Sequence, residues 1–313
     1  MTMLPLVSAL LLLAGQREHA DTSQLALELR ASEGTILVGQ PTKVSILLTA
    51  NGDMPVHPEA VRLLISSGAA FHEYASPTPG GTTAWIFPPT VGSSGPLELE
   101  RTIDIVRSVD PLGNVTHAFA LGAPGKYAVK ARYDVGSGSQ RLIRESNVVT
   151  ITAKVPTGRD LELFETHLRS HPQIVSQWAA VEPPIERRVR ELSEQYGDSP
   201  YLSAAQLGIW RRDLDRAIAP TLTHGQESAG ARTKASALLH EIGGRSLPGP
   251  FEADRLLLVA DAWVMLSDRA EAKRIYELVA ERFPDSVGAR KAEEWIRSDA
   301  EAQAAEQRIK QTP

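Results

Sequence analysis

The sequence predicts a multidomain protein in which an all-β sandwich is followed by an all-α domain of helical hairpins. Hydrophobic residues recur at every second position up to about residue 156, and at every third or fourth position beyond it. The stretch Glu252–Ser286 strengthens the second half of this prediction, because it has the pattern of two helices separated by a sharp turn. A chain of 313 residues is also long enough for about two domains.

Residues 1–20 are predicted to be a signal peptide. The apolar run Leu4–Ala14 is too short to cross a bilayer comfortably but suits the core of a signal peptide. Gln16 stands where a lipidated cysteine would be required, so we expect no stable membrane anchor after cleavage. The protein is therefore expected to be exported, to the periplasm or outside the cell. The alternative is a cytosolic protein whose N-terminal helix is buried.

The composition excludes several classes of function. The chain has no cysteine, which rules out thiol catalysis, disulfides and cysteine metal sites. In a secreted protein of this size, the lack of cysteine favours a bacterial origin. The net charge is -5 at pH 7, so the basic excess typical of nucleic-acid binders is absent and no nucleic-acid partner is expected.

Residues 21–156 are expected to form short strands with one buried face, because apolar and polar residues alternate there. The alternating apolar residues are Leu25, Leu27 and Leu29, then Val44, Ile46 and Leu48, then Leu97, Leu99, Ile103 and Ile105. Turn-forming segments rich in glycine, proline and asparagine separate these runs, as at 39–41, 51–53, 79–81 and 136–138. Many short strands with such turns predict an antiparallel sandwich.

The triplet Gly125-Lys126-Tyr127 enters a strand on which Tyr127, Val129, Ala131 and Tyr133 share one face. It resembles the tyrosine corner of immunoglobulin-like domains, whose hydroxyl bonds to the backbone upstream. Val129 stands where antibody domains have a cysteine, so the likeness is to the disulfide-free modules of bacterial secreted proteins. It covers about residues 22–155. The resemblance implies a module that binds, spaces or inhibits.

Residues 157–313 are expected to be helical. Thr157–Asp160 resembles a capping box that opens the first helix. Ser199 followed by Pro200 predicts another helix start. In the helix that follows, Leu207-Gly208 resembles the small-residue step in the first helix of a helical repeat. The last helix is expected to run from Val287 to about Ile309.

Two helical faces define the stretch Glu252–Ser286. The first comprises Leu256, Val259, Ala260 and Trp263, and the second Ala272, Ile275, Tyr276 and Val279. Ser267 is predicted to cap the second helix, and Pro284 to end it. The small residues Ala260 and Ala272, with the aromatic residues Trp263 and Tyr276, resemble a tetratricopeptide repeat. That resemblance implies a contact surface without chemistry of its own.

Trp85 and Phe87 are the predicted binding residues. They lie in the proline- and glycine-rich segment Ser76–Pro96, where large apolar residues suit a protruding contact loop. The alternative is an edge strand whose aromatic rings cover the end of the sandwich. The helical tryptophans are instead expected to pack between helices; they are Trp178, Trp210, Trp263 and Trp295.

No metal, cofactor or catalytic residue is predicted. His167 and His171 are four apart and could share one face of a helix, but no third ligand is apparent and Pro172 ends the helix. His240-Glu241 begins like a zinc-protease motif, but Gly244 occupies the position of the second histidine. His117 is in phase with apolar residues, so a hydrogen-bonded core histidine is expected.

The predicted function is non-catalytic binding or scaffolding by an exported protein, with a protein or peptide as partner. The motivation is two modules that make contact surface and no recognisable reactive constellation. One alternative is a peptidase inhibitor that inserts a sandwich loop such as Ser76–Pro96 into an active site. Another is a hydrolase with its site at the junction of the two domains.

Overall fold

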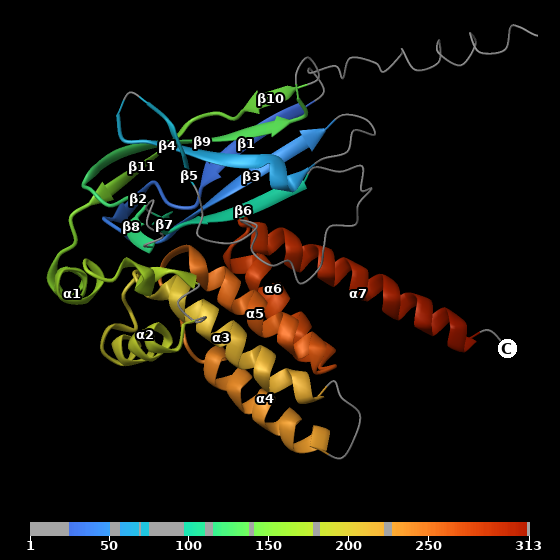
Figure 1. The fold of residues 1–313 in the computed structure, drawn as a ribbon. Coiled ribbons are helices and arrows are strands. Elements are labelled where there is room, and N and C mark those ends of the chain that lie inside the picture. Colours follow the sequence, from blue (N-terminus) through green and yellow to red (C-terminus); the bar gives the residue numbers. More distant parts are fainter. Residues whose placement is uncertain are drawn as a thin grey trace, which may run out of the picture.

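The protein places its strands on one side and its helices on the other (Figure 1). The computed structural model describes residues 25–50, 57–68, 70–74, 97–109, 115–137, 141–177, 182–221 and 227–311. Within these residues, every strand precedes Val155 and every α-helix follows Thr157. The change of secondary structure thus falls where the hydrophobic period changes from two to between three and four.

The described strands form three sheets. They are β1 (Leu25–Ala31), β2 (Thr35–Leu37), β3 (Thr42–Ala50), β4 (Val61–Ser66), β5 (His72–Tyr74), β6 (Leu97–Ile103), β7 (Ile105–Val109), β8 (Val115–Phe119), β9 (Gly125–Val135), β10 (Leu142–Glu145) and β11 (Val149–Lys154). The first sheet has the order β1-β3-β6, and the second has the order β2-β11-β9-β4-β5, with β10 also paired to β9. β7 and β8 pair only with each other among the described strands.

Most strand pairs are antiparallel, as expected for a sandwich, but β2 and β11 are parallel. The predicted alternation is confirmed in β3, where Val44, Ile46 and Leu48 are fully buried. It is confirmed again in β9, where Tyr127, Val129, Ala131 and Tyr133 point into the same core. These inward residues of the two larger sheets form the apolar layer between them.

The run that the sequence suggests from Leu97 to Ile105 is not one strand. It breaks at Asp104: β6 before it pairs with β3, and β7 after it pairs with β8. Ile103 and Ile105 are both buried, and so is Asp104 between them. Alternation alone does not reveal such a change of sheet, because apolar residues continue at every second position through the break.

The hydrogen bond expected of Tyr127 is present. Its hydroxyl donates to the carbonyl oxygen of Ala123 and accepts from the Ala123 backbone N–H, both at 2.9 Å. The backbone N–H and the carbonyl oxygen of Ala123, in the turn that precedes β9, both have a hydrogen-bond partner in this way. The two bonds fix the path of the chain into the strand.

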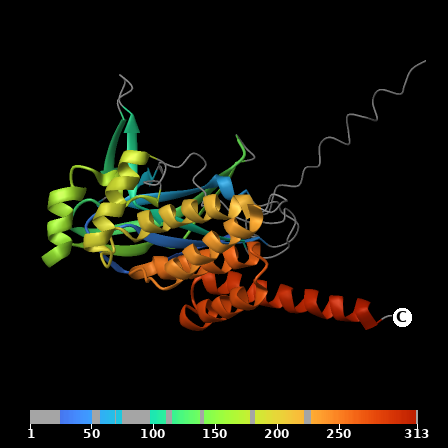
Figure 2. The same cartoon turned by 90° about the horizontal axis from the view of Figure 1, so that it is seen from below.

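The helical part follows as a series of short and long helices. They are α1 (Gly158–Leu163), the π-helical turn η4 (Phe164–Leu168), the 3₁₀ turn η5 (Pro172–Val175), α2 (Pro183–Tyr196), α3 (Ser203–Ile218), the 3₁₀ turn η7 (Ala219–Thr221), α4 (Glu227–Gly243), the 3₁₀ turn η8 (Gly249–Phe251), α5 (Glu252–Met265), α6 (Arg269–Arg282) and α7 (Val287–Gln311). A further 3₁₀ turn, η2 (Pro58–Ala60), precedes β4. Figures 1 and 2 both show α7 extending beyond the other helices.

Three predicted helix starts are wrong in detail. Thr157 precedes α1, but its side chain makes no capping hydrogen bond. The helix expected at Pro200 begins at Ser203. The cap of α6 is Asp268, whose carboxylate accepts from the Glu271 backbone N–H at 3.2 Å, whereas Ser267 lies in the left-handed region with φ 60°. A left-handed residue reverses the chain, so Ser267 forms the turn and its neighbour becomes the cap.

The two faces predicted for Glu252–Ser286 are confirmed. All eight of their residues are buried, and α5 and α6 pack against each other in one hydrophobic cluster. Trp210 and Trp263 are buried in this cluster, and the ring of Trp295 in α7 stacks on Tyr276 at 4.5 Å between centroids. Packing between helices therefore accounts for these three tryptophans; Trp178 lies outside the described residues.

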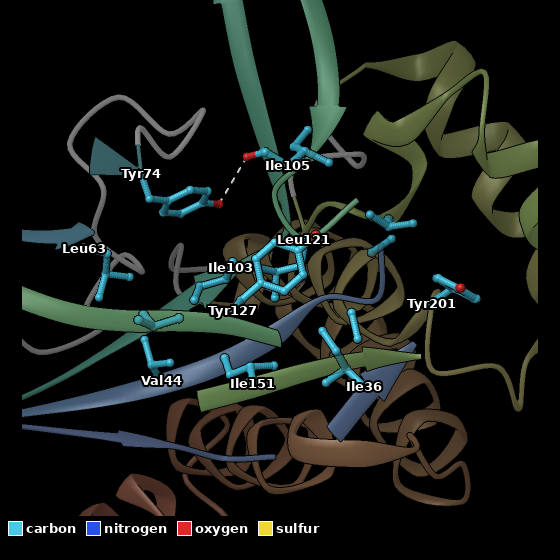
Figure 3. Packing of buried hydrophobic residues seen from close by; sticks show 14 of the residues in the cluster. Ile36, Val44, Leu63, Tyr74, Ile103, Ile105, Leu121, Tyr127, Ile151 and Tyr201 are labelled. Atoms are coloured by element: carbon cyan, nitrogen blue, oxygen red, sulfur yellow. Dashed lines mark hydrogen bonds between the residues drawn. The ribbon is translucent and has the colours of Figure 1, made fainter. Parts of the chain in front are cut away.

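The predicted fold class, an all-β domain followed by an all-α domain, is wrong, because the protein has a mixed α/β fold. One hydrophobic cluster contains inward residues of both large sheets and also Phe164, Leu168 and Tyr201 from the helical part. Figure 3 shows Tyr201 together with strand residues of this cluster. A hydrophobic period shows which face of an element is buried, but it does not show what covers that face.

Side chains from η4 and from the turn before α3 pack against one end of the sandwich. The Phe164 ring lies 5.4 Å from the ring of Phe119 and 5.8 Å from that of Tyr201. The Tyr201 hydroxyl donates to the carbonyl oxygen of Val38 at 2.7 Å.

Within the described residues, no helix is both long enough and apolar enough to cross a membrane. The predicted signal peptide, residues 1–20, lies outside them.

Candidate functional site

The candidate site is a groove of about 440 Å³ between η4, η5 and the first turns of α2. Its apolar lining comes from Ile174, Pro184 and Ile185. Its polar lining comprises Thr166, His167, His171, Gln173, Glu182 and Arg188. We call this hollow the His167 groove. It combines apolar surface with several hydrogen-bonding side chains, which is typical of a binding site.

The π-helical turn η4 presents the first part of this lining. Leu163, Phe164 and Leu168 are buried against the sandwich, whereas Thr166 and His167 line the groove. The widened turn is closed by the backbone N–H of Arg169, which donates to the carbonyl oxygen of Phe164 at 2.9 Å. Single π-helical turns are rare and often occur at functional sites, because the extra residue re-aims the side chains around it.

His167 and Arg188 lie in direct contact across the groove. An Arg188 guanidinium nitrogen is 2.8 Å from Nδ1 of His167, and another is 3.1 Å from the Glu191 carboxylate. Because a guanidinium can only donate, Nδ1 of His167 accepts, and its Nε2 carries the proton. Burial and the positive charge of Arg188 lower the pKa of His167. At neutral pH the imidazole is therefore uncharged and offers one N–H to a ligand.

His171 has a different surrounding. Its Nδ1 lies 2.9 Å from the hydroxyl of Ser170, its neighbour in the chain. Pro172 begins η5 directly after it, and the bend there brings His171 to the same groove as His167. The two histidines thus share a groove, although His171 does not lie in η4 with His167.

No group of three or more histidine, aspartate or glutamate side chains in the described part of the chain is placed to hold a metal ion. The two histidines and Glu182 line one groove, but Nδ1 of His167 already accepts from a guanidinium. A cationic neighbour at that nitrogen opposes metal binding, because the metal brings a second positive charge.

A second, smaller hollow of about 190 Å³ lies between α2 and α3. Its lining includes Arg190, Glu194, Trp210 and Arg245. Arg190 is held by the Glu186 and Asp213 carboxylates at 2.8 and 2.7 Å, and Arg245 by Glu241 at 2.6 Å. The guanidinium groups of this hollow pair with side chains of the protein, as Arg188 of the His167 groove does with Glu191. The His167 groove is the better candidate because its volume is larger.

A buried polar cluster lies at the junction of strands and helices, where the sequence allowed a hydrolase site. The Asp104 carboxylate accepts from the Tyr74 hydroxyl at 2.9 Å, from the Ser176 hydroxyl at 2.8 Å and from the Ile105 backbone N–H at 2.7 Å. The Tyr74 hydroxyl also lies 3.1 Å from the carbonyl oxygen of Ile105 (Figure 3). Burial raises the pKa of Asp104, although these hydrogen bonds oppose the shift. The cluster ties β5, the β6–β7 break and η5 together.

The predicted binding residues Trp85 and Phe87 lie outside the described residues, as does the segment 75–96 around them. His117 is half-buried in the β7–β8 hairpin, and the ring of His240 lies 5.3 Å from that of Trp263. Sequence reasoning noticed His167 and His171 but missed Arg188. The spacing of the two histidines raised the question of a metal site, which was not predicted because no third ligand was apparent. The partner that defines the groove comes from the next long helix.

The chain matches no protein-family model, and comparison with curated proteins gives no match.

Proposed function

We propose that this chain is an exported, non-catalytic binding protein that holds a segment of a protein partner in the His167 groove. The observation that carries the proposal is the convergence of the His167 N–H, Arg188 and the Gln173 amide beside an apolar surface. Such a surface holds a peptide by burying an aliphatic side chain while hydrogen-bonding the polar atoms next to it.

Charge complementarity indicates what the segment carries. Arg188 and the N–H of His167 favour a carboxylate, and Ile174 with Ile185 favours an aliphatic neighbour. Glu182 lines the same groove and repels a second carboxylate. We therefore expect one acidic residue beside an aliphatic residue, with the acidic group at Arg188.

The experiment is a selection of displayed peptides on the full chain, followed by titration of the enriched peptides. The matched variants are Arg188→Glu and Arg187→Glu. Both change the same charge on adjacent residues of α2, but Arg187 is exposed and does not line the groove. Enriched peptides should pair an acidic with an aliphatic residue, and Arg188→Glu should weaken their binding by at least about tenfold, the effect of one lost charged hydrogen bond. Arg187→Glu should leave it unchanged.

The proposal fails if no enriched peptide depends on Arg188, or if both variants weaken binding equally. Circular dichroism of both variants shows whether the fold is kept. Export is tested separately, by asking whether the chain expressed in a bacterium is found in the periplasm or the medium. Recovery only from the cytoplasm contradicts that part.

A further inference from the structure

A buried cluster of charges joins the strands to the later helices. Lys43 of β3 forms ion pairs with Glu100 of β6 and with Asp254 in the first turn of α5, the latter at 2.6 Å. The Lys43 side chain is only 5% exposed, and its ammonium also lies 5.8 Å from the centre of the Phe251 ring. We call these three charged residues the Lys43 cluster.

The two hydrophobic clusters of the protein do not merge at this face. Within the described residues, the cluster of the later helices contains side chains from α3 to α7 but none from a strand. The cluster of the sandwich reaches as far as α3, from which it includes Ala205 and Ile209. Ala204, Leu207 and Trp210 of the same helix belong to the other cluster. α3 therefore connects two bodies that are each packed around their own core.

Across the face between β3–β6 and α5–α7, ion pairs join the strands to the helices. Besides the Lys43 cluster, Arg290 of α7 pairs with Glu98, which lies two residues before Glu100 on β6. Glu33 lies against the backbone at Gly249, just before α5. Ion pairs depend on the protonation of their members, whereas apolar contacts do not.

We propose that the Lys43 cluster is a proton-binding latch that fastens α5–α7 to the sheet, with α3 as the pivot. Two carboxylates share one ammonium in this buried place, so the cluster itself carries one uncompensated negative charge. Addition of one proton removes that charge. Acidification therefore favours the closed arrangement, and alkaline conditions favour the open one.

The charged groups around the cluster agree with this direction. Burial raises the pKa of Glu100; Lys43 opposes the shift, Asp254 adds to it, and Lys291 of α7 opposes it more weakly. For Lys43, burial acts to lower the pKa, but Asp254 and Glu100 outweigh it and the net direction is upward. A carboxylate whose pKa is higher in the closed form makes closure more favourable as pH falls through that raised value.

The test is a distance measurement between two spin labels on the full chain. The chain has no cysteine, so cysteines introduced at Glu28 in β1 and Glu281 in α6, both exposed, are the only attachment points. In the doubly labelled chain, the distribution of distances between the two labels should be broad at about pH 8 and narrow at about pH 5.5. The open fraction should fall by at most about tenfold per pH unit, the limit for one proton.

Three variants decide the outcome. Glu100→Gln removes the extra charge and should give the narrow distribution at both pH values. Lys43→Met leaves two carboxylates unpaired and should give the broad distribution at both. Lys130→Met is the matched control, because Lys130 also pairs with a glutamate on a strand, Glu145 at 2.6 Å, but on the other sheet. It should behave like the parent.

The latch is overturned if the parent shows no change with pH, or if Glu100→Gln keeps the full pH response. If circular dichroism shows that Lys43→Met does not fold, Glu100→Gln alone decides between these results. The outcome does not depend on the His167 groove, which lies on other elements.

Discussion

The helices meet the strands at two places, and the two contacts differ in kind. At the end of the sandwich, Phe164, Leu168 and Tyr201 enter the same hydrophobic cluster as the strands. On the outer face of β3 and β6, the contact with α5 and α7 is made by Lys43, Arg290 and their carboxylate partners. The apolar packing of the first contact is expected to be strong and independent of protonation, and the ion pairs of the second contact are expected to be weaker and adjustable.

The largest expected effect is on the apolar contact. Phe164→Ala removes a ring that packs on Phe119 and Tyr201, and it should lower the free energy of unfolding by about 3–5 kcal/mol. Chemical denaturation monitored by circular dichroism measures it. Leu161→Ala in the preceding helix is the control, because Leu161 is 39% exposed and should cost less than about 1 kcal/mol. Equal losses in the two variants would contradict the importance of this contact.

The next effect concerns the close approach of α3 to the segment after η5. A Cβ atom added at Gly208 would lie 2.0 Å from the carbonyl oxygen of Gln177, so Gly208→Ala should lower the free energy of unfolding by about 2 kcal/mol or more. Gly230 in α4 has open space around it, and Gly230→Ala should raise stability by roughly 0.5–1 kcal/mol. The melting temperature should fall in Gly208→Ala and rise in Gly230→Ala. A change of the same sign in both variants would show that helix propensity decides both effects.

Asp104 gives a smaller effect that depends on pH. Asp104→Asn places an amide where three donors point, and it should cost about 1–2 kcal/mol. Because burial raises the pKa of Asp104 above its unfolded value, its contribution to stability is greatest at low pH and falls as pH rises through the folded value. The stability difference between parent and variant should therefore shrink from about pH 4 to about pH 7. Asp198→Asn, at a side chain 79% exposed, is the control and should change the free energy of unfolding by less than about 0.5 kcal/mol.

The smallest effect is expected on the ionic contact. Arg290→Ala removes the ion pair with Glu98. Because the Arg290 side chain is 43% exposed, the loss should lower the free energy of unfolding by less than about 1 kcal/mol. Raising the salt concentration should reduce even this difference. Arg297→Ala, further along α7 at an exposed position, is the control. A loss as large as that of Phe164→Ala would remove the distinction between the two contacts.

The buried faces of single elements could be predicted from the sequence. The alternation in β3 and β9, and the three- and four-residue spacing in α5 and α6, reflect only the geometry of one strand or one helix. Tyr127 was predictable for the same reason, because its hydrogen-bond partner Ala123 is four residues away. Each of these features is local.

The features that define the groove and the latch were not predictable in this way. His167 meets Arg188 because η4 widens by one residue and α2 folds back beside it. Lys43 lies on the face of β3 opposite to Val44, Ile46 and Leu48, and α5 covers it and brings Asp254. Periodicity says nothing about which polar residues of distant elements will meet.

The sequence by itself determined where strands end and helices begin, and which side of most elements is apolar, because these follow from the repeat of one chain in one conformation. Only the tertiary structure decided that the helices share the core of the sandwich and that a charged contact holds the rest of them. Such contacts depend on how elements that are far apart in the sequence are placed relative to one another. That placement depends on the packing of the whole chain.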